Sequence, residues 1–136
     1  MFLAEKLQRT LDEFEYVEDP QERLGLIIDR ARNFPPLAAF DRVEANRVRG
    51  CVSVVWLVAE VRERRCYFRA DAESPLVRGL VVFVADFFSG APVDEIAASA
   101  LDPLAELGLI RNLSPTRRNG LAAALNSIRT FAAKFR

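Results

Sequence analysis

Residues 46–71 read NRVRGCVSVVWLVAEVRERRCYFRAD, and this stretch decides the fold because it is the one strand-like region of the chain. The β-branched run over 52–61 predicts a long strand, and residues 66–71 predict a second one. The polar residues 62–65 between them form the turn of an antiparallel hairpin. A short strand over 47–49, just before Gly50, would add a third antiparallel strand.

Helical signals fill the chain on both sides of this stretch. Leu3, Leu7, Leu11 and Phe14 fall on one stripe, which predicts a first helix from about residue 2 to 15. Further helix starts have an N-cap residue followed by proline, namely Asp19-Pro20, Ser74-Pro75 and Ser114-Pro115. The remaining predicted helices run from Asp19 to Pro35, over 75–89, over 115–134, and in two short pieces near 92–98 and 102–107.

The predicted fold class is therefore α+β, with a small three-stranded antiparallel sheet and helices packed mainly on one face. The chain has 136 residues, about half of them apolar. That length suits one domain over 1–136, and we find no repeat or linker that would divide it.

Composition excludes several kinds of function. Lysine plus arginine and aspartate plus glutamate number 19 each, so bulk charge gives no pull toward nucleic acid or an anionic membrane. The absence of histidine rules out Cys-His catalysis and histidine-ligated metal sites. No stretch predicts a membrane span or a signal peptide. We therefore expect a cytoplasmic protein whose two cysteines are free thiols.

Cys51 is the candidate for chemistry. It follows Gly50 at the turn between the short and the long predicted strand, where another protein could reach it. A thiolate can attack an activated persulfide without a general base, so the lack of histidine is compatible with sulfur transfer. From spacing alone, the favoured interpretation of Cys51 is a small buried apolar residue. Cys66 begins the apolar alternation Cys66-Phe68-Ala70, which favours packing over chemistry.

The two cysteines should not form a disulfide. A hairpin turning at 63–64 places Cys66 opposite Val61, which leaves Cys51 about 30 Å away along the strand at about 3.3 Å per residue. A disulfide requires Cα atoms within about 7 Å.

Charged residues offer weaker signals of partner docking. Arg49 adjoins Cys51, and Asp71 with Glu73 follows the second strand, where solvated loop acids are also common. Arg117 and Arg118 fall in the first turn of the last helix, where cations oppose the helix dipole. These two arginines could bind a carboxylate of a partner protein, or form an internal salt bridge to Asp71 or Glu73.

The order of several motifs resembles the SufE family from about residue 10 to 131. The motifs that carry the resemblance are Pro35-Pro36, the run from Asn46 to Leu57, the run from Phe68 to Ser74, the run from Val77 to Leu80, the run from Leu113 to Leu121, and Ile128-Arg129. This resemblance changes the interpretation of Cys51 from a packing residue to a functional one.

The resemblance implies a fold shared with IscU-type scaffold proteins. It also implies that Cys51 takes a persulfide from a PLP-dependent, SufS-like cysteine desulfurase, activates that enzyme, and delivers sulfur to a SufBCD-like complex for iron–sulfur cluster assembly. Such a protein is a persulfide carrier rather than an independent enzyme, and it holds no cofactor. Its cysteine lies near an apolar pocket. Val52 and Val54 depart from the family, which often has glutamine at both positions.

Two other functions stay open on sequence grounds. An IscU-like scaffold would bind a cluster, although this chain has only two cysteines. A non-catalytic adaptor would bind a desulfurase without accepting sulfur.

Overall fold

The computed structural model describes all residues from Met1 to Arg136. Its elements in chain order are α1 (Phe2–Glu13), α2 (Pro20–Ala31), the 3-10 helix η1 (Glu44–Asn46), β1 (Val55–Arg62), β2 (Arg65–Ala72), α3 (Pro75–Phe88), α4 (Val93–Ala98), α5 (Pro103–Glu106) and α6 (Pro115–Ala133). The predicted helices are all present, and the α+β class is confirmed. No helix has the length and apolar character that crossing a membrane requires.

The hairpin has the register that the sequence predicts. β1 pairs with β2 in antiparallel fashion, and Val61 lies opposite Cys66. Glu63 and Arg64 form the turn, with φ angles of 51° and 67°. Two central residues in the left-handed region match the twist of the strands, as in a type I′ hairpin turn.

The prediction of three strands is wrong, because the sheet has only β1 and β2. The predicted strand over 47–49 is reduced to one isolated bridge, Arg47 with Trp56, and one hydrogen bond of 2.9 Å from Val48 N to Val55 O. On one side of the bridge the chain coils into η1, and on the other Gly50 takes a φ of 79°. Neither conformation continues a strand, so the pairing stops after one bridge. For the same reason β1 begins at Val55 rather than at residue 52.

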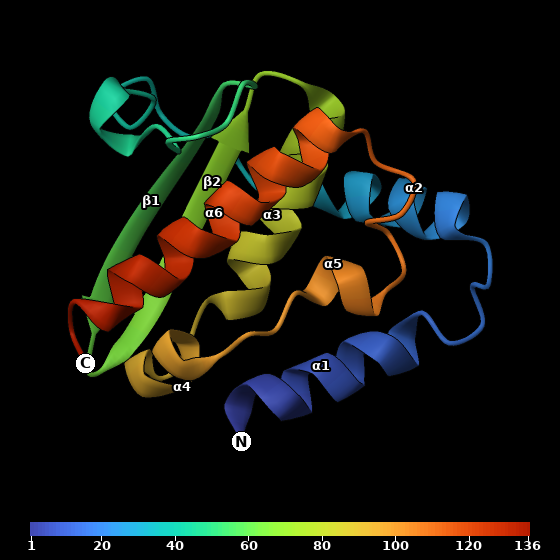
Figure 1. Ribbon diagram of the computed structural model, residues 1–136, viewed down its shortest axis with the longest axis horizontal. Coiled ribbons are helices and arrows are strands. Elements are labelled where there is room, and N and C mark those ends of the chain that lie inside the picture. The colour runs from blue at the N-terminus through green and yellow to red at the C-terminus, as the bar shows by residue number, and fades with distance from the viewer.

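One apolar core joins the hairpin to the helices. Cys66, Phe68, Ala70 and Ala72 alternate along β2 and are buried on the same face of the sheet. α3 runs beside β2 and α6 lies across the hairpin, as Figure 1 shows. Ser74 and Ser114 cap these two helices through their side-chain oxygens, so both begin where the sequence predicts. The hairpin and the two helices together place the loop of residues 49–54 against α6.

Candidate functional site

Cys51 lies in the irregular loop that leads from the Arg47 bridge into β1. The next residue, Val52, points into solvent with 82 % of its surface exposed. Cys51 itself is half-buried and packs against the edge of the apolar core. The loop therefore holds its thiol against the protein, while the neighbouring backbone is open to a partner.

The thiol rests on α6 at a position where the helix has no side chain. A Cβ atom added to Gly120 would lie only 2.7 Å from the Sγ atom of Cys51. A Cβ added to Gly50 would lie 3.9 Å from the Cβ of Ala123, one turn further along α6. We call the surface formed by Gly120 and Ala123 the sulfur seat. A glycine inside a helix costs about 1 kcal/mol relative to alanine, and this close approach accounts for its presence.

Sequence reasoning did not find the role of Gly120. In the sequence this residue stands out only as part of a family motif. The available signal was a glycine inside a predicted helix, which often marks a close approach. The signal could not name Cys51 as the neighbour, because the two residues are far apart in sequence.

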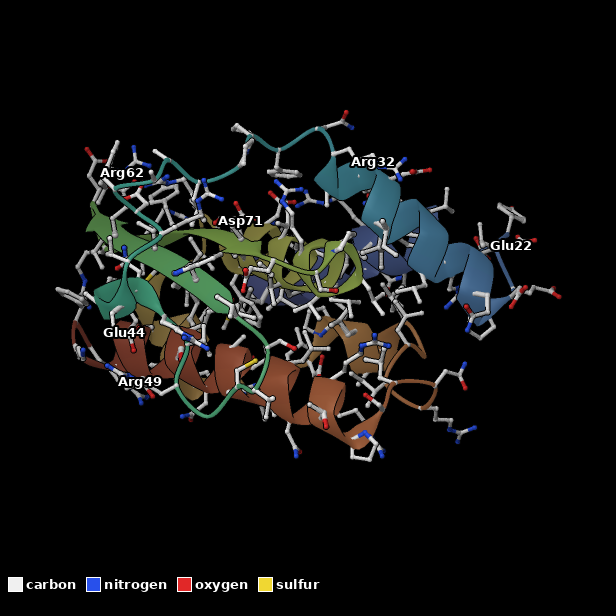
Figure 2. All side chains as sticks on the ribbon, turned by 90° about the horizontal axis from the view of Figure 1, so that it is seen from above. Glu22, Arg32, Glu44, Arg49, Arg62 and Asp71 are labelled. Carbon is white, nitrogen blue, oxygen red and sulfur yellow. The ribbon has the colours of Figure 1, made fainter.

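The three candidate docking arginines are exposed. Arg49 forms a surface ion pair of 3.4 Å with Glu44, and Figure 2 shows this pair apart from Asp71. Arg117 and Arg118 lie in the first turn of α6 and form no ion pair within the chain. The alternative of an internal bridge from either arginine to Asp71 or Glu73 is therefore absent from the structure.

Asp71, unlike these arginines, lies in a buried cluster inside the protein. Its side chain is buried, with one oxygen 2.9 Å from Nε of Arg78 and the other accepting a 3.0 Å hydrogen bond from Leu37 N. Arg78 also donates to the carbonyl oxygens of Ala31 and Phe34. This buried cluster ties the segment after α2 to β2 and α3. In this conformation the carboxylate of Asp71 faces no partner, so Asp71 does not belong to an exposed docking surface.

Cys66 cannot share the chemistry of Cys51. It is fully buried, with 0 % of its surface exposed, and both cysteines are free. Burial raises the pKa of the Cys66 thiol above its ordinary value of 9.0, because the thiolate loses its solvation. A reagent or partner from solvent therefore finds Cys51 and not Cys66.

The side chains that usually bind metal ions do not cluster in this structure. No group of three or more histidine, cysteine, aspartate or glutamate side chains lies close enough together to hold a metal ion.

Comparison with known proteins identifies the family. Residues 8–132 match the sequence profile of SufE, described as an Fe-S metabolism associated domain. The chain belongs to the SufE family. Within it, the chain is 36 % identical over 134 residues to an uncharacterised SufE-like protein of Rhizobium etli, covering 95 % of this chain and 90 % of that one. It is also 37 % identical over 120 residues to SufE-like protein 1, chloroplastic/mitochondrial, of Arabidopsis thaliana, covering 88 % of this chain and 32 % of that one.

A solved structure shares the fold of this SufE-family chain. The solution structure of a hypothetical protein from Thermus thermophilus matches with a TM-score of 0.75. The match covers 95 % of this chain and 94 % of that one at 21 % sequence identity, so it supports the architecture alone. Family membership places the chain in iron–sulfur metabolism.

Proposed function

We propose that this protein is a sulfur acceptor that takes a persulfide onto Cys51 from a PLP-dependent cysteine desulfurase. The observation that carries the proposal is that Cys51 is the one thiol within reach of a partner, held in an irregular loop beside the exposed Val52. A sulfur carrier needs such a thiol on a part of the chain that can move. Residues 49–54 are joined to the hairpin by the single bridge at Arg47 and by the bond from Glu73 N to Val54 O, so few backbone bonds hold this loop in place.

The transfer is a thiol exchange that needs no other catalytic group on the acceptor. The thiolate of Cys51 attacks the outer sulfur of the desulfurase persulfide. The new bond joins Sγ of Cys51 to that sulfur, the desulfurase sulfur–sulfur bond breaks, and the desulfurase thiolate leaves. Removing the persulfide frees the desulfurase for another turnover, so the acceptor activates it. The sulfur then passes to a SufBCD-like complex for cluster assembly.

Docking of the desulfurase is proposed to involve Arg49, Arg117 and Arg118. The guanidinium groups of Arg117 and Arg118 have no partner in the chain and stand at the end of α6 that carries the sulfur seat. Arginine offers a planar fork of donors that suits a carboxylate on a partner. Replacing either Arg117 or Arg118 by alanine should weaken desulfurase binding by about 1–3 kcal/mol in a calorimetric titration. The thermal unfolding temperature should stay unchanged, because neither side chain forms an internal ion pair.

The central test is the intact mass of the protein after incubation with a cysteine desulfurase and cysteine. The wild type should gain one sulfur atom on Cys51, and Cys66→Ser should do the same. Cys51→Ser should gain none and should not activate the desulfurase. A Cys51→Ser protein that still activates fully would show a non-catalytic adaptor and would overturn the proposal.

A further inference from the structure

The outer edge of β1 has unpaired backbone groups. Val54 O accepts from Glu73 N on the β2 side, whereas Val55 O accepts from Val48 N on the outer side. Backbone groups alternate along a strand, so beyond the bridge between Arg47 and Trp56 the residues Ala59 and Val61 direct their N–H and C=O groups outward. No strand lies beside this part of the edge.

The edge is open because the chain leaves it early. Continuing the bridge between Arg47 and Trp56 backward would place Asn46 opposite Leu57 and Ala45 opposite the next residue. Those residues instead belong to η1, which curls away from β1 (Figure 1). The position of the third strand that the sequence predicts is therefore vacant along most of β1.

A groove follows this vacant position, with a cavity volume of about 440 Å³. We call it the β1 groove. Its charged lining residues are Arg47, Arg49 and Lys134. Arg49 pairs with Glu44 outside the lining, whereas Arg47 and Lys134 form no ion pair within the chain. The uncharged lining residues are Ala45, Asn46 and Val48 before β1, Leu57 and Ala59 of β1, and Asn126, Ser127, Thr130 and Phe131 of α6.

The basic residues stand at both ends of the groove. Arg47 and Arg49 lie at the start of β1, next to Cys51. Lys134 follows α6 at the hairpin end, where Arg64 donates a hydrogen bond to Phe135 O. Asn126 and Ser127 come one turn after Ala123, so the groove continues directly from the sulfur seat.

We propose that the β1 groove binds an extended, acidic segment of the protein that exchanges sulfur with Cys51, as a third strand on the edge of β1. Only an extended backbone satisfies a row of alternating donors and acceptors, and only negative side chains complement a lining whose charges are all positive. The proposal extends the proposed function, because a strand in this groove would bring the partner to within one helical turn of the seat of Cys51.

The test is amide hydrogen exchange of the full-length protein with and without a probe peptide. The probe is an acetylated and amidated peptide of alternating glutamate and valine, and the control peptide has lysine in place of glutamate. The amides of Ala59 and Val61 should exchange at least about tenfold more slowly with the glutamate peptide. The lysine peptide should leave them unchanged.

Variants separate the groove from nonspecific charge effects. Arg47→Glu combined with Lys134→Glu should abolish protection by the glutamate peptide. Arg62→Glu, a matched reversal on β1 outside the groove lining, should retain it. Ala59→Pro removes one outward donor without touching the bonds to β2 and should weaken protection, if the variant keeps its thermal transition.

The proposal fails if the glutamate peptide gives no protection, or if the lysine peptide protects equally. It also fails if the edge amides become protected without peptide as the protein concentration rises, because the occupant is then a second copy of this chain. Cys51→Ser should bind the peptide as the wild type does. A failure here is therefore distinct from a failure of sulfur acceptance, which the mass measurement reports.

Discussion

Gly120→Ala should drive the Cys51 thiol off the sulfur seat. The substitution adds one methyl group at a point 2.7 Å from the Sγ atom. Ordinary contact between nonbonded heavy atoms is about 3.5–4.0 Å, so one of the two atoms must move by about 1 Å. The methyl group is fixed to a regular helix, whereas Cys51 lies in an irregular loop. The loop is therefore the part that gives way.

The size of the effect follows from the cost of overpacking. Forcing an extra methyl group into a well-packed contact costs about 1–3 kcal/mol. The seated position of Cys51 loses that amount relative to the unseated one, which shifts the equilibrium by about 5- to 150-fold. Folding stability should change little, because alanine recovers about 1 kcal/mol of helix propensity at the same position.

The assay is the rate of alkylation of Cys51 by iodoacetamide, with peptide mass mapping to separate it from Cys66. Gly120→Ala should react several-fold to about a hundredfold faster than the wild type when the seated state limits access. Gly25→Ala is the matched control, since it places the same methyl group in helix α2 with no atom within 4 Å. It should leave the alkylation rate unchanged.

An unchanged or slower alkylation rate in a Gly120→Ala protein with an unchanged unfolding temperature would refute the role of the seat. The same result would follow if the helix rather than the loop yields. Thermal unfolding separates these cases, because a displaced α6 lowers the unfolding temperature and an unseated loop does not.

Three further predictions concern stability. Gly79→Ala should destabilise the protein by about 1–3 kcal/mol in urea unfolding, since its new Cβ would lie 3.0 Å from a backbone atom of α2, whereas Gly25→Ala should stabilise by up to about 1 kcal/mol. Asp71→Asn should cost about 1–3 kcal/mol, because it removes the counter-charge of Arg78 and places an amide donor in a buried site, although Arg78 keeps its bonds to the carbonyl oxygens of Ala31 and Phe34. Asp29→Asn on an exposed pair should cost less than Asp71→Asn, and equal losses would contradict the buried-cluster assignment. Burial raises the pKa of Cys66 above 9.0, so the neutral thiol contributes fully to the free energy of unfolding below pH 9.0, and this contribution is lost as the pH rises through the folded-state pKa. The difference in unfolding free energy between wild type and Cys66→Ala should therefore shrink above pH 9.0. A difference that stays constant with pH would contradict this.

The hairpin register could be predicted because local chemistry determines it. The polar residues between two apolar runs locate the turn, and the turn fixes every pair from Val55–Ala72 to Arg62–Arg65. Helix starts are equally local, since Ser74 and Ser114 cap their own helices through side-chain oxygens.

The parts of the fold that could not be predicted depend on backbone conformation and on contacts that composition does not reveal. Residues 47–49 have strand-like composition, but η1 and Gly50 on either side stop the pairing after one bridge. The sequence predicts a docking acid at Asp71, because nothing near it in the chain reveals that Leu37 and Arg78 enclose it. Cys51 is identified through the family motifs, and its contact with Gly120 required the folded chain.

The burial of Cys66 has a consequence for the lifetime of a persulfide on this protein. A persulfide is discharged as hydrogen sulfide when a second thiol attacks its inner sulfur and closes a disulfide. Cys66 is sealed in the core opposite Val61, and β1 starts only at Val55, so about 20 Å of strand separates it from the loop of Cys51. The chain thus holds no internal resolving thiol. Under the proposed function, a sulfur atom placed on Cys51 would therefore leave by reaction with another molecule.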